Sequence, residues 1–283
     1  MKILDKLRSK LRYVHLTPLK YTDEVRMAYF GGSVTGGNLR NKTVIITGGN
    51  GGIGKALCLR FAKEGCKVIF TARSEDKINK MKAYFTTILP DADVEGMLLD
   101  ITDLGSIKKF VEMVRVFNID ILINNAGVFT DIDRKHLFRS VSVYDFNNTW
   151  ACNFVGMKVL TEEIATLMDN TNGDGSIINI SSICALFNSF RYSPYGISKS
   201  AVNYFTHETR KKFPKLSVHA IAPGSVATGM GHLKNGDDIS SNCNYLKHIA
   251  LPEEIASLAA FLASDSGRLI TNIPVVASAG ENL

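Results

Sequence analysis

A tyrosine and a lysine stand four residues apart in the segment SPYGISK, residues 193–199. Ser193 and Pro194 are residue types that commonly cap and open a helix, so Tyr195 and Lys199 are expected on one helix face. A phenol with a pKa near 10 is a weak proton donor at neutral pH. An ammonium about 4 Å away would offer about 4 kcal/mol at an effective dielectric of 20, which would lower that pKa. The pair therefore predicts a tyrosine that acts as a general acid or base.

A glycine-rich turn follows the first β-branched segment, TVIIT at residues 43–47. Its glycines, Gly48, Gly52 and Gly54, fit the pattern TGxxxGxG and lead into a helical segment. Such a turn lets the backbone approach a pyrophosphate closely at the free N–H groups of a helix N-terminus. We predict a dinucleotide site here, with Asn50 and Ile53 of the same turn among its contacts.

The end of the second strand indicates which dinucleotide is bound. An acidic residue there would bind the ribose 2′-hydroxyl, but Ala72 and Arg73 occupy this place. A small neutral residue followed by a guanidinium suits a 2′-phosphate. We therefore favour NADP (NADPH) over NAD, with a solvated surface arginine as the alternative reading of Arg73.

These residues require a scaffold of alternating strands and helices, and the sequence has that alternation from residue 42 onward. Apolar strand segments at 43–47, 67–72, 94–100, 119–125, 176–181, 216–222 and 273–278 are separated mostly by helical segments. Fully apolar strands that alternate with helices are typical of a parallel sheet covered on both faces. We predict one α/β domain over residues 41–283, a doubly wound, Rossmann-type parallel sheet of about seven strands flanked by helices.

Several motifs in this order resemble those of the short-chain dehydrogenase/reductase family, and the resemblance runs from about residue 42 to 278. NNAG at 124–127 and PGSVAT at 223–228 match two family motifs beside the cofactor, and YxxxK matches Tyr195 and Lys199. The resemblance implies that the cofactor is held further by Asp100 and Ile101, by Asn125, Ala126 and Gly127, and by Pro223, Gly224, Val226 and Thr228, as well as by Tyr195 and Lys199.

The resemblance also implies two further catalytic residues. Ser182 lies thirteen residues before Tyr195, the usual family spacing for the serine that binds the substrate oxygen. Strand alternation sends the adjacent Ser181 in the opposite direction. Asn153 matches the family asparagine that helps to continue a proton relay from the lysine. Lys199 is expected to hold the ribose hydroxyls.

The implied function is that of an NADP-dependent oxidoreductase, which transfers a hydride between the nicotinamide and a hydrophobic carbonyl or alcohol such as a lipid, steroid or retinoid. The apolar segment 183–193 and the long segment 229–251 are expected to surround the substrate. Two alternatives stay open: a 3-oxoacyl-type reductase of fatty-acid metabolism, and a non-catalytic NADP-binding sensor or scaffold. Six histidines show no metal-binding spacing, and we expect no metal site.

The formal net charge of +6 is concentrated in residues 1–40, which carry eight basic and three acidic side chains and so contribute +5. The remainder is near neutral, which argues against a nucleic-acid partner. We predict that residues 1–40 form a basic amphipathic extension and linker. Residues 1–16 could pack on the domain or a partner, lie on a membrane surface, or serve as an organelle-targeting segment. Five scattered cysteines fit a reducing compartment, and we expect a cytoplasmic protein, with association to a membrane as an alternative. A homo-oligomer is expected, with a dimer favoured over a tetramer because the segment ITNIPVVASAG departs from the family ending.

Overall fold

The structure is a computed structural model, and it describes residues 35–36, 38–129, 142–171, 174–187, 193–231, 245–246, 248–271 and 273–281. One seven-stranded sheet forms its centre, with the strand order β3-β2-β1-β4-β5-β6-β7. All pairs of neighbouring strands are parallel. The strands are β1 Thr43–Ile46, β2 Lys67–Ala72, β3 Val94–Leu98, β4 Ile121–Asn124, β5 Ser176–Ile180, β6 Ser217–Pro223 and β7 Val275–Ala277. The predicted doubly wound parallel sheet is confirmed.

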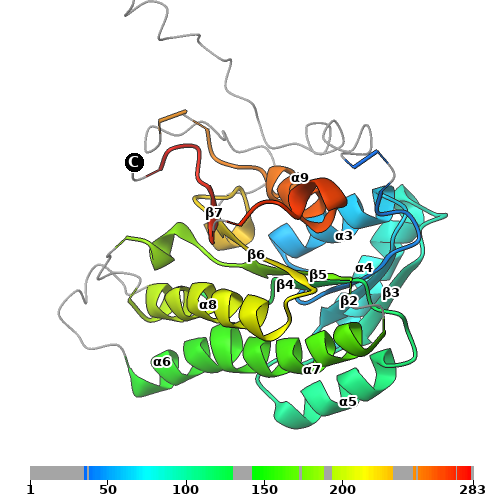
Figure 1. Cartoon of the computed structure of the whole chain (residues 1–283), viewed down its shortest axis with the longest axis horizontal. Coiled ribbons are helices and arrows are strands. Elements are labelled where there is room, and N and C mark those ends of the chain that lie inside the picture. The colour runs from blue at the N-terminus through cyan, green and yellow to red at the C-terminus, as the bar shows by residue number, and fades with distance from the viewer. Residues whose placement is uncertain are drawn as a thin grey trace, which may run out of the picture.

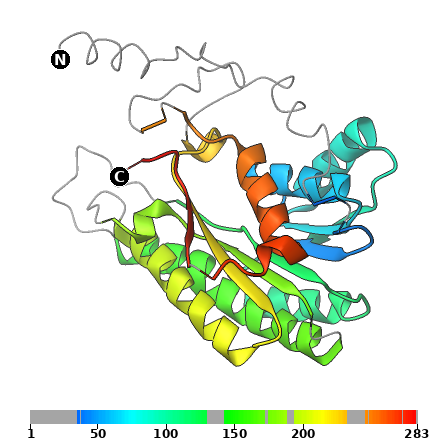
Figure 2. The same ribbon diagram turned by 45° about the horizontal axis from the view of Figure 1, so that its top comes forward.

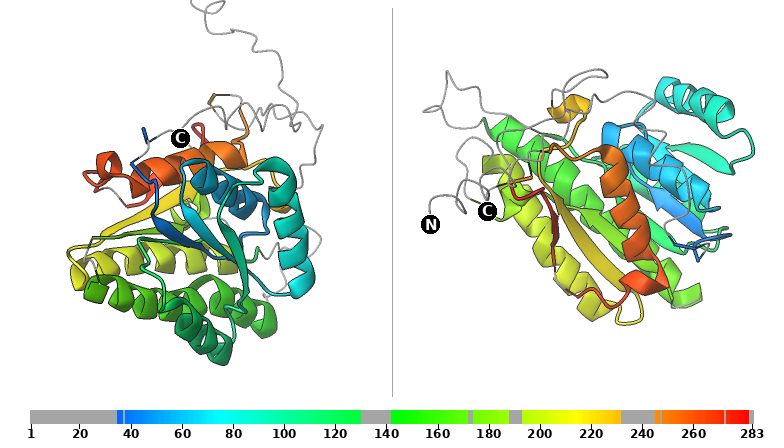
Figure 3. Two further views of the ribbon diagram at one scale, coloured as in Figure 1. Left: turned by 90° about the vertical axis from the view of Figure 1, so that its right-hand side faces the viewer. Right: turned by 90° about the horizontal axis from the view of Figure 1, so that it is seen from above.

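Helices cover both faces of this sheet, as Figures 1 and 3 show. One face packs against α3 (Gly52–Lys63), α4 (Glu75–Ile88) and α9 (Pro252–Ala263). The opposite face packs against α5 (Leu104–Val114) and α7 (Gly156–Thr171), and α8 (Ser193–Lys212) lies beside α7. Because each face is covered, the strands carry uninterrupted apolar residues instead of an alternating pattern.

The predicted strands agree with the observed ones to within a few residues. The segment KVIFTA coincides with β2, whereas the predicted strand 273–278 shortens to Val275–Ala277. Pro274 precedes β7 and has no N–H to donate to a neighbouring strand, which explains the later start. The described residues also include α6 (Val143–Trp150), which continues into a π-helical turn at Ala151–Val155 before α7.

A chain of buried amides and hydroxyls links the two central strands to the helices beneath them. Asn124 Nδ2 on β4 donates to Thr161 Oγ1 of α7 at 2.8 Å and to Asn179 Oδ1 of β5 at 2.7 Å. Asn179 Nδ2 in turn donates to Thr206 Oγ1 of α8 at 2.9 Å. Buried polar groups cost free energy unless they are paired, so this chain specifies the register of β4, β5, α7 and α8.

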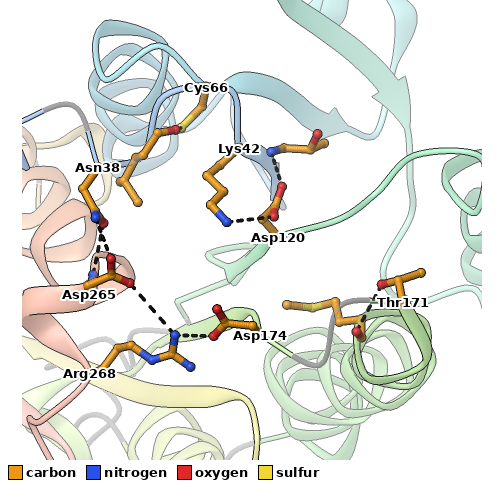
Figure 4. Close-up of polar contacts among 11 residues, drawn as sticks. Asn38, Lys42, Cys66, Asp120, Thr171, Asp174, Asp265 and Arg268 are labelled. Carbon is orange, nitrogen blue, oxygen red and sulfur yellow. Dashed lines mark hydrogen bonds and ion pairs between the residues drawn. The ribbon is translucent and has the colours of Figure 1, made fainter.

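The amino-terminal edge of the sheet is closed by polar contacts between distant segments (Figure 4). Asn38 Nδ2 donates to Asp265 Oδ2 at 2.6 Å, Lys42 pairs with Asp120 at 3.3 Å, and Arg268 forms an ion pair with Asp174. Leu39 is buried in the domain core, so this part of the chain before residue 41 packs on the domain. The amphipathic segment 1–16 and the remainder of residues 1–34 lie outside the described residues.

Candidate active site

A cleft of about 990 Å³ lies at the carboxyl-terminal edge of the sheet. β1 is the strand at which the order reverses, since it pairs with β2 on one side and β4 on the other. Ligands of open parallel sheets bind outside the strand ends at such a reversal. The cleft is lined by residues that follow the strands β1 to β6, together with residues of α8, of the π-helical turn and of the C-terminal tail. The sequence-predicted residues that line it are Gly48, Asn50, Gly52, Ile53, Gly54, Arg73, Ile101, Asn125, Ala126, Gly127, Ser182, Tyr195, Lys199, Pro223, Gly224, Val226 and Thr228.

The glycine-rich turn is held by the NNAG segment across the strand reversal. Asn125 Nδ2 donates to the main-chain oxygens of Thr47 and Gly48 at 2.9 and 3.1 Å. A Cβ on Gly54 would collide with the Gly48 carbonyl, so the tight turn requires glycine at this position. Helix α3 begins here without a side-chain cap at Gly51, and N–H groups of its first turn remain available to an anion. This arrangement fits the pyrophosphate of a dinucleotide.

Two basic side chains line the cleft near the end of β2. Arg73 follows the last strand residue, Ala72, and Lys77 lies one turn further along in α4. The carboxylate of Asp100 does not form part of the cleft wall and instead accepts from Thr102 N at 2.9 Å and Thr102 Oγ1 at 2.7 Å. These hydrogen bonds, with a smaller effect of Arg73, lower the pKa of Asp100. The two cations therefore form the polar surface at this end.

The catalytic candidates meet where β5 and α8 face the cleft. Tyr195 and Lys199 lie in the first two turns of α8, and Ser182 follows the end of β5. The Ser182 hydroxyl accepts from Cys184 N at 3.1 Å and is close enough to the Tyr195 phenol to influence its pKa, whereas Ser181 Oγ donates to the main-chain oxygen of Lys199 at 3.3 Å. The two serines thus point in different directions, and Ser182 is the one beside Tyr195.

Lys199 does not approach the phenol as the sequence led us to expect. Its Nζ donates to the Ile180 main-chain oxygen at 2.8 Å and lies 5.7 Å from the centroid of the Tyr195 ring. Burial raises the pKa of Tyr195 above its usual value, and the nearby Ser182 hydroxyl offsets only part of this effect. The expected lowering of that pKa is therefore wrong for this geometry. Burial also lowers the pKa of Lys199 to about 8.

Asn153 lies behind the cleft, in the π-helical turn between α6 and α7. Its Oδ1 accepts from Val128 N at 2.8 Å, and its Nδ2 donates to Val128 O at 2.9 Å and Ser198 Oγ at 3.1 Å. π-Helical turns are rare and frequently occur at functional sites. Through Ser198, this asparagine connects the segment after β4 to the helix that carries Tyr195 and Lys199.

Several cleft residues were missed by the sequence reasoning. The ring of Phe129 packs edge-on against Tyr195, with centroids 5.0 Å apart, and Lys77, Cys152 and Glu281 also line the cleft. Lys77 could have been found because it lies in the first turn of α4, which begins two residues after Arg73. Phe129 and Cys152 lie beside the predicted residues Gly127 and Asn153, but their residue types give no sign of a position in the cleft. Glu281 lies outside all the motifs, and no local signal identifies it. Of the two predicted substrate segments, residues 183, 184, 187, 229 and 230 line the cleft, and residues 188–192 and 232–244 lie outside the described residues.

The residues that the structure describes contain no metal-binding cluster and no membrane-spanning helix. In that part of the chain, no group of three or more His, Cys, Asp or Glu side chains is arranged to hold a metal ion. Its helices include none that is long and apolar enough to cross a membrane. The four described cysteines, Cys58, Cys66, Cys152 and Cys184, are free thiols.

Comparison with known proteins gives consistent matches over most of the chain. A family model described as short chain dehydrogenase matches residues 42–238. The 7alpha-hydroxysteroid dehydrogenase of Bacteroides fragilis is 29% identical over 250 residues, which cover 85% of this chain and 94% of that protein. A 3-oxoacyl-(acyl-carrier-protein) reductase of Thermotoga maritima is 30% identical over 239 residues, covering 82% and 94%. A solved structure of a short chain dehydrogenase/reductase family protein superposes with a TM-score of 0.75 at 26% identity, covering 86% of this chain and 98% of that one.

Proposed function

The chain belongs to the short-chain dehydrogenase family of nicotinamide-dependent oxidoreductases, and from this premise we propose that it transfers a hydride between NADP and a hydrophobic carbonyl or alcohol. The observation that carries the proposal is the convergence of Ser182, Tyr195 and Lys199 beside a glycine-rich turn in one cleft. The bound nicotinamide supplies the hydride in reduction and accepts it in oxidation.

In this proposal Tyr195 is the acid–base residue. The raised pKa keeps the Tyr195 phenol protonated at neutral pH, so the residue carries the proton that a carbonyl oxygen receives in reduction, while the same shift makes it a weaker acid than a free tyrosine. Ser182 donates a hydrogen bond to the oxygen on which charge develops. Lys199 holds the ribose hydroxyls and returns a proton toward Tyr195, and Asn153 positions the elements on either side of the cleft.

The preference for NADP rests on the basic end of the cleft. Arg73 and Lys77 both line it, and Ala72 replaces the acidic residue that would select a free ribose hydroxyl. A guanidinium can bind a 2′-phosphate through two parallel hydrogen bonds, and a lysine adds a second positive charge. Asp100 would support the adenine pocket from behind, because its carboxylate orders the turn that begins with Ile101 and Thr102.

The substrate proposed is hydrophobic because the cleft beside Tyr195 has apolar walls. Phe129, Ile183, Phe187 and Met230 line this part of it. The relative in Bacteroides fragilis is a hydroxysteroid dehydrogenase, which supports a sterol-like or other lipid alcohol. The similarity to the Thermotoga reductase favours a second candidate, a 3-oxoacyl thioester. A non-catalytic sensor role is the weakest alternative, since the four candidate catalytic residues are all present.

We further propose that the protein is a homodimer in the cytoplasm and that residues 1–16 contact a membrane surface. Apolar and aromatic side chains are exposed on adjacent helices, at Val143 and Tyr144 of α6 and at Ile197 and Tyr204 of α8. Exposed apolar surface of this kind commonly marks a contact between proteins.

The test is NADPH oxidation by the purified protein with a panel of hydrophobic ketones, aldehydes and 3-oxoacyl thioesters. We expect turnover by the wild type with at least one of them, and the best substrate distinguishes the two candidates. Tyr195→Phe should still bind NADPH but lose about a hundredfold to ten-thousandfold in kcat, because it removes the proton donor but keeps the ring. Tyr84→Phe, which alters a tyrosine outside the cleft, is the control. Equal turnover by Tyr195→Phe and the wild type would refute the assignment.

A further inference from the structure

The C-terminal tail returns to the cleft directly after the last strand. β7 runs parallel to β6, with Ala277 opposite Pro223, and Figure 2 shows the two strands side by side. The chain then turns sharply, since Ala279 and Gly280 both have positive φ angles and Glu281 N donates to Ser278 O at 2.9 Å. This turn brings the side chain of Glu281 to the end of β6, where it lines the cleft.

Glu281 binds the segment that follows β6 through both carboxylate oxygens. Its Oε2 accepts from Ser225 N at 2.6 Å, and its Oε1 accepts from Ser225 Oγ at 3.1 Å. A Cβ at Gly224 would lie 2.7 Å from Oε2, so the absence of a side chain there allows this approach. Hydrogen bonds to an ionised acceptor are stronger than those between neutral groups.

The same segment is held from its other side by a contact with residue 250. Ala250 N donates to Ser225 O at 3.1 Å, and Ala227 N donates to Ala250 O at 2.8 Å. Ser225 is therefore fixed at both its N–H and its C=O. Gly224, Val226 and Thr228, on either side of it, form the wall of the cleft that we assign to the nicotinamide end of the cofactor.

We propose that Glu281 is a positioning residue for this wall: the tail fastens residues 223–228 in the geometry that accepts the nicotinamide half of the cofactor. This inference rests on the proposed function. It predicts that cofactor affinity depends on a carboxylate that belongs to none of the family motifs in the sequence. Because the nicotinamide is common to both dinucleotides, the effect should be the same for NADPH and NADH.

The test compares dissociation constants for NADPH and NADH, measured by fluorescence titration, in Glu281→Ala, Glu281→Gln and the wild type. We expect Glu281→Ala to weaken the binding of both dinucleotides between about threefold and tenfold. Glu281→Gln keeps one acceptor oxygen and should restore part of the affinity. The melting temperature should stay within a degree or so of the wild-type value, and kcat should recover at saturating cofactor. Glu163→Gln, an exposed carboxylate on α7, is the matched control and should change nothing.

The positioning role would be overturned if Glu281→Ala bound both dinucleotides with unchanged affinity. It would also be overturned if the variant lost stability but its folded form kept full affinity. Either result would leave the proposed function intact. A loss confined to NADPH would also overturn the positioning role, because that pattern belongs to the 2′-phosphate end. Failure of the wild type to bind either dinucleotide would remove the proposed function, and this inference with it.

Discussion

Arg73 and Lys77 are the residues with which cofactor choice can be tested most directly. Neither takes part in an ion pair among the described residues, and both line the cleft. Arg73→Ala should lower NADPH affinity by about tenfold to a hundredfold and leave NADH affinity unchanged, because only NADPH carries the 2′-phosphate. Lys77→Ala should have the same selectivity with a smaller effect. Titration of each variant with both dinucleotides measures these differences.

Lys80→Ala provides the control for this pair. Lys80 lies on α4, the helix that also carries Lys77, and its ammonium pairs with Asp76 at 2.8 Å on the exposed surface. It should leave the affinity for both dinucleotides unchanged. An equal loss of affinity for NADH and NADPH in Arg73→Ala would contradict a role for the arginine at the 2′-phosphate. It would show instead that Arg73 stabilises the end of β2.

At the residue level, the sequence identified side chains that belong to a motif of fixed spacing. The turn from Gly48 to Gly54 and the pair Tyr195 and Lys199 reach the same cleft because each motif spans a strand end or the start of a helix. The pKa of Tyr195 could not be anticipated, since it depends on burial and on whether Lys199 bonds to the phenol or to a main-chain oxygen. The contact of Glu281 could not be predicted, because its partner, Ser225, is distant in sequence.

Among the structural elements, β6 carries a buried ionisable group with a measurable consequence. His219 is fully buried and its Nε2 contacts Ser217 Oγ at 2.7 Å. Burial, with a smaller contribution from Arg210, lowers its pKa to about 4. The unfolded chain, whose histidine has a pKa near 6.5, therefore binds more protons between pH 4 and 6.5. The free energy of unfolding should fall by about 1.4 kcal/mol for each pH unit as the pH drops through this window.

Urea unfolding at pH 7, 6 and 5 measures this slope, and His219→Gln should remove most of it. The comparison with the variant is needed because other groups also titrate in or near this pH range. His248 has a raised pKa owing to Glu254, so its contribution to stability grows as the pH falls toward the unfolded-state pKa near 6.5 and is complete below that value; this slope has the opposite sign and affects the upper end of the measured range. An identical pH slope in the wild type and His219→Gln would show that β6 does not hold a neutral histidine.

The strands were more predictable than the connections between them. Apolar β-branched segments such as TVIIT and SIINIS identify buried strands because both of their faces are covered. The π-helical turn at Ala151–Val155 has no comparable signal, since its residues also suit an ordinary helix. Its position is set by the contacts of Asn153 with Val128 and Ser198, which only the folded chain brings together.

For the molecule as a whole, the proposed dimer is testable through the exposed aromatic residues of α6 and α8. Tyr204 is 68% exposed, and burying it in an interface would favour association. Tyr204→Glu should shift the protein from dimer to monomer, because a buried unpaired charge opposes association. Light scattering coupled to size-exclusion chromatography measures the mass. Tyr245→Glu, the same substitution at a tyrosine 82% exposed elsewhere, is the control. A wild-type monomer, or a Tyr204→Glu dimer, would contradict this interface.

The two edges of the parallel sheet have different roles. At one edge, Asn38, Lys42 and Arg268 join distant segments to Asp265, Asp120 and Asp174. The cleft opens at the opposite edge, where the strand ends are followed by turns. Divergence can therefore act on the two edges separately: turns that select a new substrate can accumulate changes while the contacts that hold the fold stay as they are. A protein with this architecture can therefore acquire a new substrate without first losing the ability to fold.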